Sequence, residues 1–191
     1  QDLYGAGYYL GTQVVERNPD IKAGDKALLI SGSWADPGRN LRPIGVEDAL
    51  KEKGIKTVRI NIPKEAIESA TKAAPYISGA LAKNPDTKIL FLDHMEVAVA
   101  IKMACEDNGI SPDAIYGIGF DLNPAVIDLL KEGYIDLISD QQPFLQGFLS
   151  VVNAALAVRW GFTGLYIDTG RGLVDRNNVD MIAPLVEEGI R

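Results

Sequence analysis

Short apolar runs recur along the chain, and they constrain its fold more than any other feature. Six runs have the length of a strand, and they are rich in Ile, Leu and Val throughout instead of alternating with polar residues. Strands with this pattern are buried on both faces of a parallel sheet. The runs are Ala27–Ser31, Val58–Ile62, Ile89–Asp93, Ile115–Asp121, Ile135–Asp140 and Leu165–Asp168.

Stretches with helical spacing separate these runs. The clearest is Pro124–Glu132, with Asn123 as a predicted N-cap, Pro124 at the first helical position and Gly133 as a stop. Strand and helix alternate, which predicts an α/β fold: a three-layer α/β/α sandwich on a parallel sheet of about five strands, in the order 2-1-3-4-5. The other predicted helices are Leu3–Arg17, Ile44–Lys53, Lys64–Lys83, Glu96–Asp107, Pro143–Trp160 and Asn177–Glu188.

Two predicted helices stand out. The first opens the chain without a preceding strand, carries Tyr4, Tyr8 and Val15 near one stripe, and has Gly7 and Gly11 where a neighbour can approach closely. The helix over 143–160 is apolar nearly all round, and such a helix is buried on more than one side. A single sheet does not supply both sides. Its apolar residues are Phe144, Leu145, Phe148, Leu149, Val151, Val152, Leu156 and Trp160.

Charge and composition exclude several classes. The 191 residues carry 26 acidic and 19 basic side chains, a net charge of −7, without a basic cluster, which argues against a nucleic-acid partner. No run reaches the roughly 18 apolar residues of a membrane span. One cysteine, Cys105, and one histidine, His94, cannot form a disulfide framework or a structural zinc cage, and no cofactor is predicted. Cys105 is expected to be a small buried helix residue.

Polar residues follow the predicted strands. In open α/β sheets, ligands lie beyond the carboxyl ends of the strands. Carboxylates and amide oxygens accept hydrogen bonds from hydroxyls, while guanidinium and amide groups donate to them, so this inventory suits a small polyhydroxylated ligand. The candidate ligand-binding residues are Trp34, Asn40, Arg42, Asp93, His94, Asp121 and Gln141.

Each candidate also has a purely structural interpretation. Asp121 could cap the following helix, Arg42 could pair with Glu47 or Asp48 on the surface, and His94 and Gln141 could be ordinary loop residues. Trp34 fits a loop anchor better than a sugar-stacking ring.

Catalytic motifs are missing. The chain contains no phosphate-binding Gly-x-x-x-x-Gly-Lys loop and no Gly-x-Ser-x-Gly elbow, and its carboxylates show no diagnostic spacing. Polar strand ends without a catalytic motif favour a binding protein over an enzyme.

Six segments, which together cover essentially the whole chain, carry a resemblance to known proteins. They are Asp2–Gly7, Arg42–Leu50, Phe91–Glu96, Tyr116–Pro124, Leu130–Gly133 and Asp140–Gly147. In this order, the segments resemble the periplasmic sugar-binding proteins of ABC transporters, type I, near the ribose-binding branch.

The resemblance implies two α/β lobes joined by three hinge strands, which close on one sugar without catalysis. It implies ligand contacts at Arg42, Asp121 and Gln141, and it puts His94 where the family often has Asn. It divides the chain into a second lobe (2–140), a returning segment of the first lobe (141–168) and a last crossing segment with a helix (169–191). The implied hinge residues are Gln1, Asp2, Asp140, Gln142 and Asp168.

The same resemblance implies that the opening part of a first lobe is absent from this chain, which starts with Gln1 and shows no signal segment. We therefore expect a processed chain or a fragment. The 143–160 helix would then lack its cover and could promote self-association.

Three functions remain open. The first is an extracytoplasmic solute-binding component of an ABC importer, located in the periplasm, with a sugar or polyol as ligand and the membrane permease as partner. The second is the effector-binding core of a lactose-repressor-type regulator. The third, least favoured, is an enzyme of flavodoxin-like fold.

Overall fold

A six-stranded sheet forms the centre of the molecule in the computed structural model, which describes residues 1–191. The strand order is β2-β1-β3-β4-β5-β6, and all neighbours are parallel except β6, which runs antiparallel to β5. The predicted order of five strands is confirmed, with a sixth strand added at one edge. The strands are β1 (Lys26–Ser31), β2 (Lys56–Asn61), β3 (Thr87–Leu92), β4 (Tyr116–Phe120), β5 (Leu137–Asp140) and β6 (Gly172–Val174).

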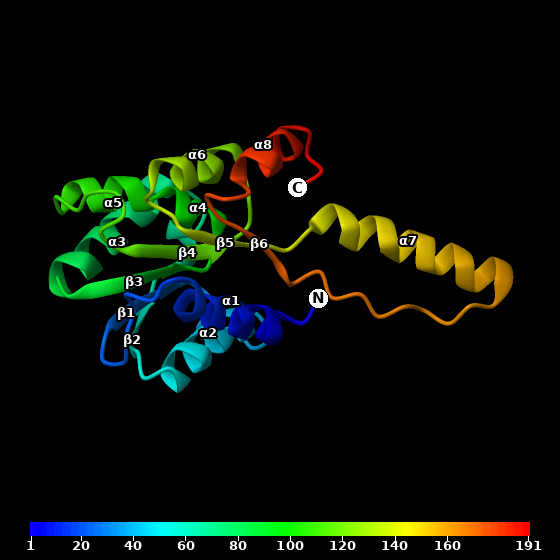
Figure 1. Cartoon of the computed structure of the whole chain (residues 1–191), viewed down its shortest axis with the longest axis horizontal. Helices are drawn as coiled ribbons and strands as arrows, with labels where there is room; N and C mark the ends of the chain where they lie inside the picture. The colour runs from blue at the N-terminus through cyan, green and yellow to red at the C-terminus, as the bar shows by residue number, and fades with distance from the viewer.

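Helices cover both faces of the sheet and give the predicted three layers (Figure 1). One face carries α1 (Leu3–Arg17) and α2 (Leu41–Glu52). The other carries the 3₁₀ turn η1 (Lys64–Ala66), α3 (Ala70–Lys83), α4 (Met95–Val99), α5 (Ile101–Asp107), α6 (Pro124–Glu132) and α8 (Val179–Glu187). The two apolar clusters are separated by the sheet, so its strands are buried on both sides, as their composition predicts.

The caps predicted for α6 are present. The Asn123 side chain accepts a hydrogen bond from the Val126 amide at 2.7 Å, and Gly133 ends the helix in the left-handed conformation at φ 88°. Cys105 is buried in α5, as expected, and burial raises the pKa of its thiol to about 11.

Close contact between α1 and α2 confirms the role predicted for the first helix's glycines. A Cβ on Gly7 would lie 2.1 Å from the Arg42 carbonyl oxygen, and one on Gly11 would lie 2.8 Å from the Ala49 Cβ. Tyr4 and Tyr8, which the sequence places near one stripe, stack on each other with ring centres 6.1 Å apart. The buried face of α1 consists of Ala6, Gly7, Leu10, Gly11 and Val14.

The last predicted strand, Leu165–Asp168, is also wrong. This segment has no regular structure, and Leu165 and Tyr166 are largely exposed. The sixth strand lies four residues later, at Gly172–Val174, where the chain returns to the edge of β5. An apolar run becomes a strand only where a neighbouring strand is available to pair with it.

Two predicted helices are interrupted. The 64–83 segment forms η1 and then α3, because Ser69 adopts an extended conformation between them. The 96–107 segment forms α4 and α5, which join at Ala100. The predicted bounds of the helices over 44–53 and 177–188 differ from α2 and α8 by up to three residues, as is usual at helix ends.

Helix α7 (Pro143–Trp160) projects away from the body, and an extended return segment runs back beside it (Figure 1). None of its residues is buried; the Phe148 and Trp160 side chains are 55% and 61% exposed. Within this chain the predicted burial on more than one side is not found. Although α7 is the longest helix, none of the helices is both long and apolar enough for a membrane span.

Candidate functional site

The strand order reverses direction between β1 and β3, and the polar strand ends meet there. At this switch point, Ser31 at the end of β1 donates its hydroxyl to Asp93 Oδ2 at 2.6 Å, just beyond the end of β3. Asp93 is fully buried. Crevices at a switch point in such sheets are the usual place for a ligand, so the predicted residues lie where an α/β sheet offers a binding site.

Arg42 is the cation that faces this carboxylate. Its Nε lies 3.3 Å from Asp93 Oδ1, and its Nη2 donates to the Asp93 carbonyl oxygen at 3.2 Å. The guanidinium also stacks 4.8 Å from the centre of the Phe120 ring. Arg42 is therefore fixed by an ion pair, a backbone contact and an aromatic face, which presents the rest of its donors in a defined direction.

Asp121 reaches the same place from the end of β4. Its Oδ2 lies 3.9 Å from Arg42 Nη1, and its Oδ1 accepts a hydrogen bond from the Gln141 side-chain amide, which follows β5. Asp121 adopts the left-handed conformation at φ 74°, which is uncommon outside glycine and is found at functional sites. Burial raises the pKa of its carboxyl, against the lowering effect of Arg42.

His94 completes the cluster. Its Nε2 lies 3.4 Å from the Gly32 amide nitrogen and from Ser33 Oγ, and 3.5 Å from Asp93 Oδ2. Burial lowers the pKa of the imidazole, although Asp93 acts in the opposite direction. Nε2 thus faces both the Gly32 amide, which donates, and the Asp93 carboxylate, which accepts, so its role depends on the tautomer of the ring.

Other side chains fill the purely structural roles that the sequence suggested for these residues. Glu47 pairs with Arg59 at 2.5 Å, and Asp48 accepts from the Tyr4 hydroxyl at 3.1 Å, so neither acid holds Arg42. The cap of α6 is Asn123. Arg42, Asp93, His94, Asp121 and Gln141 are thus brought together by the contacts described above.

Trp34 and Asn40 have contacts of a different kind. The Trp34 indole donates to the Ile60 carbonyl oxygen at 3.3 Å, and Arg59 stacks 4.5 Å from its ring. The Asn40 amide donates to the Trp34 carbonyl oxygen at 3.3 Å. Both contacts anchor the loop between β1 and α2, the role that the sequence favours for Trp34.

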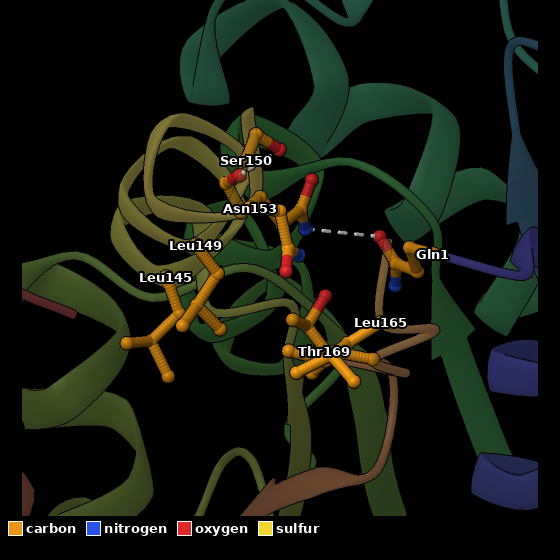
Figure 2. Close-up of a pocket in the computed structure, with 9 residues that line it drawn as sticks. Gln1, Leu145, Leu149, Ser150, Asn153, Leu165 and Thr169 are labelled. Carbon is orange, nitrogen blue, oxygen red and sulfur yellow. Dashed lines mark hydrogen bonds between the residues drawn. The ribbon is translucent and has the colours of Figure 1, made fainter. Parts of the chain in front are cut away.

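The predicted hinge residues gather on three adjacent segments. Gln142 Nε2 donates to the Thr169 carbonyl oxygen at 3.1 Å, and Gln146 Nε2 contacts Gln1 Oε1 at 3.4 Å. Asp2 caps α1, and Asp168 accepts from the Gly170 amide. Figure 2 shows Gln1 beside Thr169 and Leu165, in a cavity of about 210 Å³ that is also lined by Leu145 and Leu149 of α7.

Three participants were not predicted from the sequence. Ser31 and Ser33 hold Asp93 and His94, and Phe120 carries the Arg42 guanidinium. Ser31 is the last residue of β1 and Ser33 lies in the loop that follows, so their position at a strand end was the signal that could have identified them. The sequence contains no such signal for Phe120, because the last residue of a buried strand usually belongs to the core.

The comparisons with known proteins identify the fold and the family. The sequence model of a protein family described as a periplasmic binding protein domain matches residues 1–161. The chain belongs to this family of periplasmic binding proteins.

Its relatives include sugar-binding proteins. The chain is 28% identical over 189 residues to the xylose/arabinose-binding protein XylF of Sulfolobus acidocaldarius, covering 94% of this chain and 44% of that protein. It is 25% identical over 134 residues to a D-ribose/D-allose-binding protein of Pseudomonas aeruginosa, covering 70% of this chain and 41% of that protein. The chain therefore spans less than half the length of these two relatives.

Solved structures agree with the fold. GanP, a glucose-galactose binding protein from Geobacillus stearothermophilus, superposes with a TM-score of 0.76 at 27% identity, covering 93% of this chain and 61% of GanP. A carbohydrate transporter solute-binding protein from Agrobacterium radiobacter, solved with D-arabinose, gives a TM-score of 0.73 at 25% identity, covering 100% of this chain and 64% of that chain.

Proposed function

We propose that the complete protein carrying this chain is the solute-binding component of an ABC importer and binds a sugar or polyol between two lobes without transforming it. The observation that carries the proposal is the cluster at the switch point, where one guanidinium lies against the carboxylates of Asp93 and Asp121. A hydroxyl-rich ligand needs both donors and acceptors in one place, and this cluster supplies them.

The ligand contacts that we propose are Arg42, Asp93, His94, Asp121 and Gln141. Trp34 and Asn40 were predicted as direct contacts as well; their hydrogen bonds support the role of a scaffold for the loop after β1. We also propose the domain division that the resemblance implies: residues 2–140 form one lobe, residues 141–168 belong to the other lobe, and residues 169–191 make the last crossing between them. Hinge closure around the ligand is the movement expected of such proteins.

The proposed location is extracytoplasmic, and the proposed partner is the membrane permease of the importer. Membership of the periplasmic binding protein family supports both. The names of the relatives, all of them sugar-binding proteins, favour transport over the lactose-repressor-type regulator.

The test is titration calorimetry of the complete gene product with D-xylose, L-arabinose, D-arabinose, D-ribose, D-allose, D-glucose, D-galactose and myo-inositol. We expect saturable binding of at least one of these compounds, and recovery of that compound unchanged after prolonged incubation. Conversion of the sugar into a product would overturn the proposal in favour of an enzyme. Binding to none of them would overturn the sugar assignment.

A further inference from the structure

An ion pair links the segment after α8 to the second of the three proposed crossing segments. Asp140, the last residue of β5, is almost fully buried, and its Oδ2 accepts a hydrogen bond from Arg191 Nη1. Its Oδ1 accepts from the Gln142 amide at 2.9 Å. One buried carboxylate thus connects Arg191 to the backbone that leads into α7.

The end of α8 brings Arg191 to this position. Gly189 lies in the left-handed conformation at φ 71°, its amide donates to the Val186 carbonyl oxygen, and the Ile190 amide donates to the Leu185 carbonyl oxygen. These two bonds form the Schellman motif that ends many helices and turns the chain back. The Arg191 amide also donates to the Leu185 carbonyl oxygen, at 3.1 Å. The helix itself is anchored in the core by Val179, Ile182 and Val186, so Arg191 is held by a rigid element.

The backbone on the other side of Asp140 is strained. Gln142 adopts φ 54° and ψ 55°, a left-handed conformation that only surrounding contacts can maintain in a residue with a Cβ. Its carbonyl oxygen accepts from the Gln146 amide within α7. Two contacts connect Gln142 to the rest of the body: the Asp140 carboxylate holds its amide, and its own side chain donates to the Thr169 carbonyl oxygen at 3.1 Å. Without the first, this turn loses the contact that connects it to the sheet.

Gln141, which lies between these two residues, is one of the proposed ligand contacts. Its side chain donates to Asp121, and its carbonyl oxygen accepts from Gln146 Nε2 at 2.7 Å. The direction of the Gln141 side chain therefore depends on the turn that Asp140 and Gln142 define.

We propose that Arg191 is a positioning residue for sugar binding: it neutralises Asp140, and the fixed carboxylate then holds the Gln141–Gln142 turn in the conformation that aims Gln141 at Asp121. This inference rests on the proposed function. A buried carboxylate that loses its only cation takes up a proton or admits water, and either change loosens its hold on the Gln142 amide.

The test compares variants of the complete gene product by calorimetry, with the sugar that the wild type binds most tightly among those named above. Arg191→Ala is expected to weaken sugar binding by about tenfold relative to the wild type. Arg191→Lys keeps the charge, so its affinity is expected to lie between those of the wild type and Arg191→Ala. Arg17→Ala is the matched control. Arg17 forms an ion pair with Asp175 at 2.5 Å near the starts of β4 and β5, at the opposite edge of the sheet, and its loss should leave the affinity unchanged.

Amide hydrogen exchange supplies a reading that a general loss of stability would not give. In Arg191→Ala, the Gln142 amide should exchange faster, while amides in the middle of β1 and β3 keep their protection. Should Arg191→Ala fold poorly, the double variant Arg191→Ala/Asp140→Asn removes the unpaired charge but keeps an oxygen for the Gln142 amide. We expect it to bind within about threefold of the wild type.

Equal affinity of Arg191→Ala and the wild type would overturn the inference while leaving the proposed function intact. A double variant that binds as weakly as Arg191→Ala would also overturn it, because the loss would then not come from the stranded charge. If the wild type binds none of the sugars, the proposed function fails, and the exchange of the Gln142 amide still decides whether Arg191 controls the turn.

Discussion

Gly7 and Arg42 touch through their backbones: a Cβ atom on Gly7 would lie 2.1 Å from the Arg42 carbonyl oxygen. The helix that carries the central cation of the candidate site is thus located by a residue without a side chain on the neighbouring helix. Gly45 adds a reciprocal contact, because its Cβ would lie 2.3 Å from the Tyr4 carbonyl oxygen. The small residues of α1 and α2 therefore determine where Arg42 stands over the sheet.

Gly7→Ala should consequently destabilise the fold. The clashing atom is a backbone oxygen, so α2 has to move, and overpacking of this kind costs about 1–3 kcal/mol. Gly79→Ala is the control, since Gly79 is an exposed glycine inside α3 with nothing within 4 Å of its added Cβ. There the substitution should stabilise the protein by about 0.5–1 kcal/mol, because alanine favours a helix. Urea unfolding of both variants checks the prediction, and a stabilised Gly7→Ala would contradict it.

Much of the site could be predicted from the sequence because one rule applied. Asp93, Asp121 and Gln141 directly follow buried strands, and Arg42 lies at the start of the helix after the first strand's loop. Parallel strands bring their carboxyl ends to one edge of the sheet. No such rule predicts contacts between residues that are far apart in the sequence. Arg191 and Asp140 are 51 residues apart and meet through the end of α8, and β6 has only three residues and no apolar run. The predicted strand at Leu165–Asp168 was wrong because an apolar run does not show whether a neighbouring strand is present to pair with it.

Asp121→Ala should weaken sugar binding more than Trp34→Ala. The first variant leaves a ligand hydroxyl without its acceptor in a closed cleft, which costs about 1–3 kcal/mol, or roughly 5- to 150-fold in affinity. Trp34 contacts Ile60 and Arg59 and should matter mainly for the loop. Calorimetry with the complete gene product measures both.

The left-handed backbone at Asp121 calls for a companion variant. Alanine is disfavoured at φ 74°, whereas asparagine tolerates this conformation. Asp121→Asn therefore removes the charge without straining the turn, and it should still bind more weakly than the wild type, because the amide accepts at only one of its two positions. Wild-type affinity in both Asp121 variants would show that this carboxylate does not touch the ligand.

His94 should make the fold less stable in mild acid. Burial lowers the pKa of the folded imidazole below its usual value, so between the unfolded pKa of about 6.5 and the lower folded value the unfolded chain binds more protons. The contribution of His94 to the free energy of unfolding is therefore lost as the pH falls below about 6.5. In His94→Asn this part of the pH dependence should disappear. Denaturant unfolding of both proteins between about pH 5 and 7.5 tests it; parallel curves would contradict the assignment.

Asp136 should act in the opposite direction at the far edge of the sheet. Burial raises the pKa of its carboxyl to about 6, although the Gly117 amide donates to it at 2.8 Å and Arg176 lies nearby. The folded state then binds more protons than the unfolded state between about pH 4 and 6, so the cost of the buried charge is complete above this range and vanishes below it.

Asp136→Asn should therefore raise the free energy of unfolding by roughly 1–3 kcal/mol at about pH 7.5, and the gain should shrink toward zero near pH 4. Asp113→Asn is the matched control, because Asp113 is a neighbouring exposed carboxylate whose ion pair with Arg176 lies at the surface. Surface ion pairs contribute only about 0–1 kcal/mol. Unfolding curves for both variants at several pH values measure the difference, and a gain that is independent of pH would refute the explanation.

The 191-residue chain expressed by itself should associate through α7. Phe144, Phe148 and Trp160 are each about half exposed or more, and contiguous exposed apolar side chains of this kind mark an interaction surface. The 143–160 helix is apolar nearly all round, so a second copy can cover it in more than one orientation. Light scattering should detect dimers or larger species, and Phe148→Glu/Trp160→Glu should shift them toward the monomer. Calorimetry on the same chain should show no tight sugar binding, because the proposed cleft needs contacts from both lobes. A monodisperse monomer that binds a sugar with micromolar affinity would contradict both expectations.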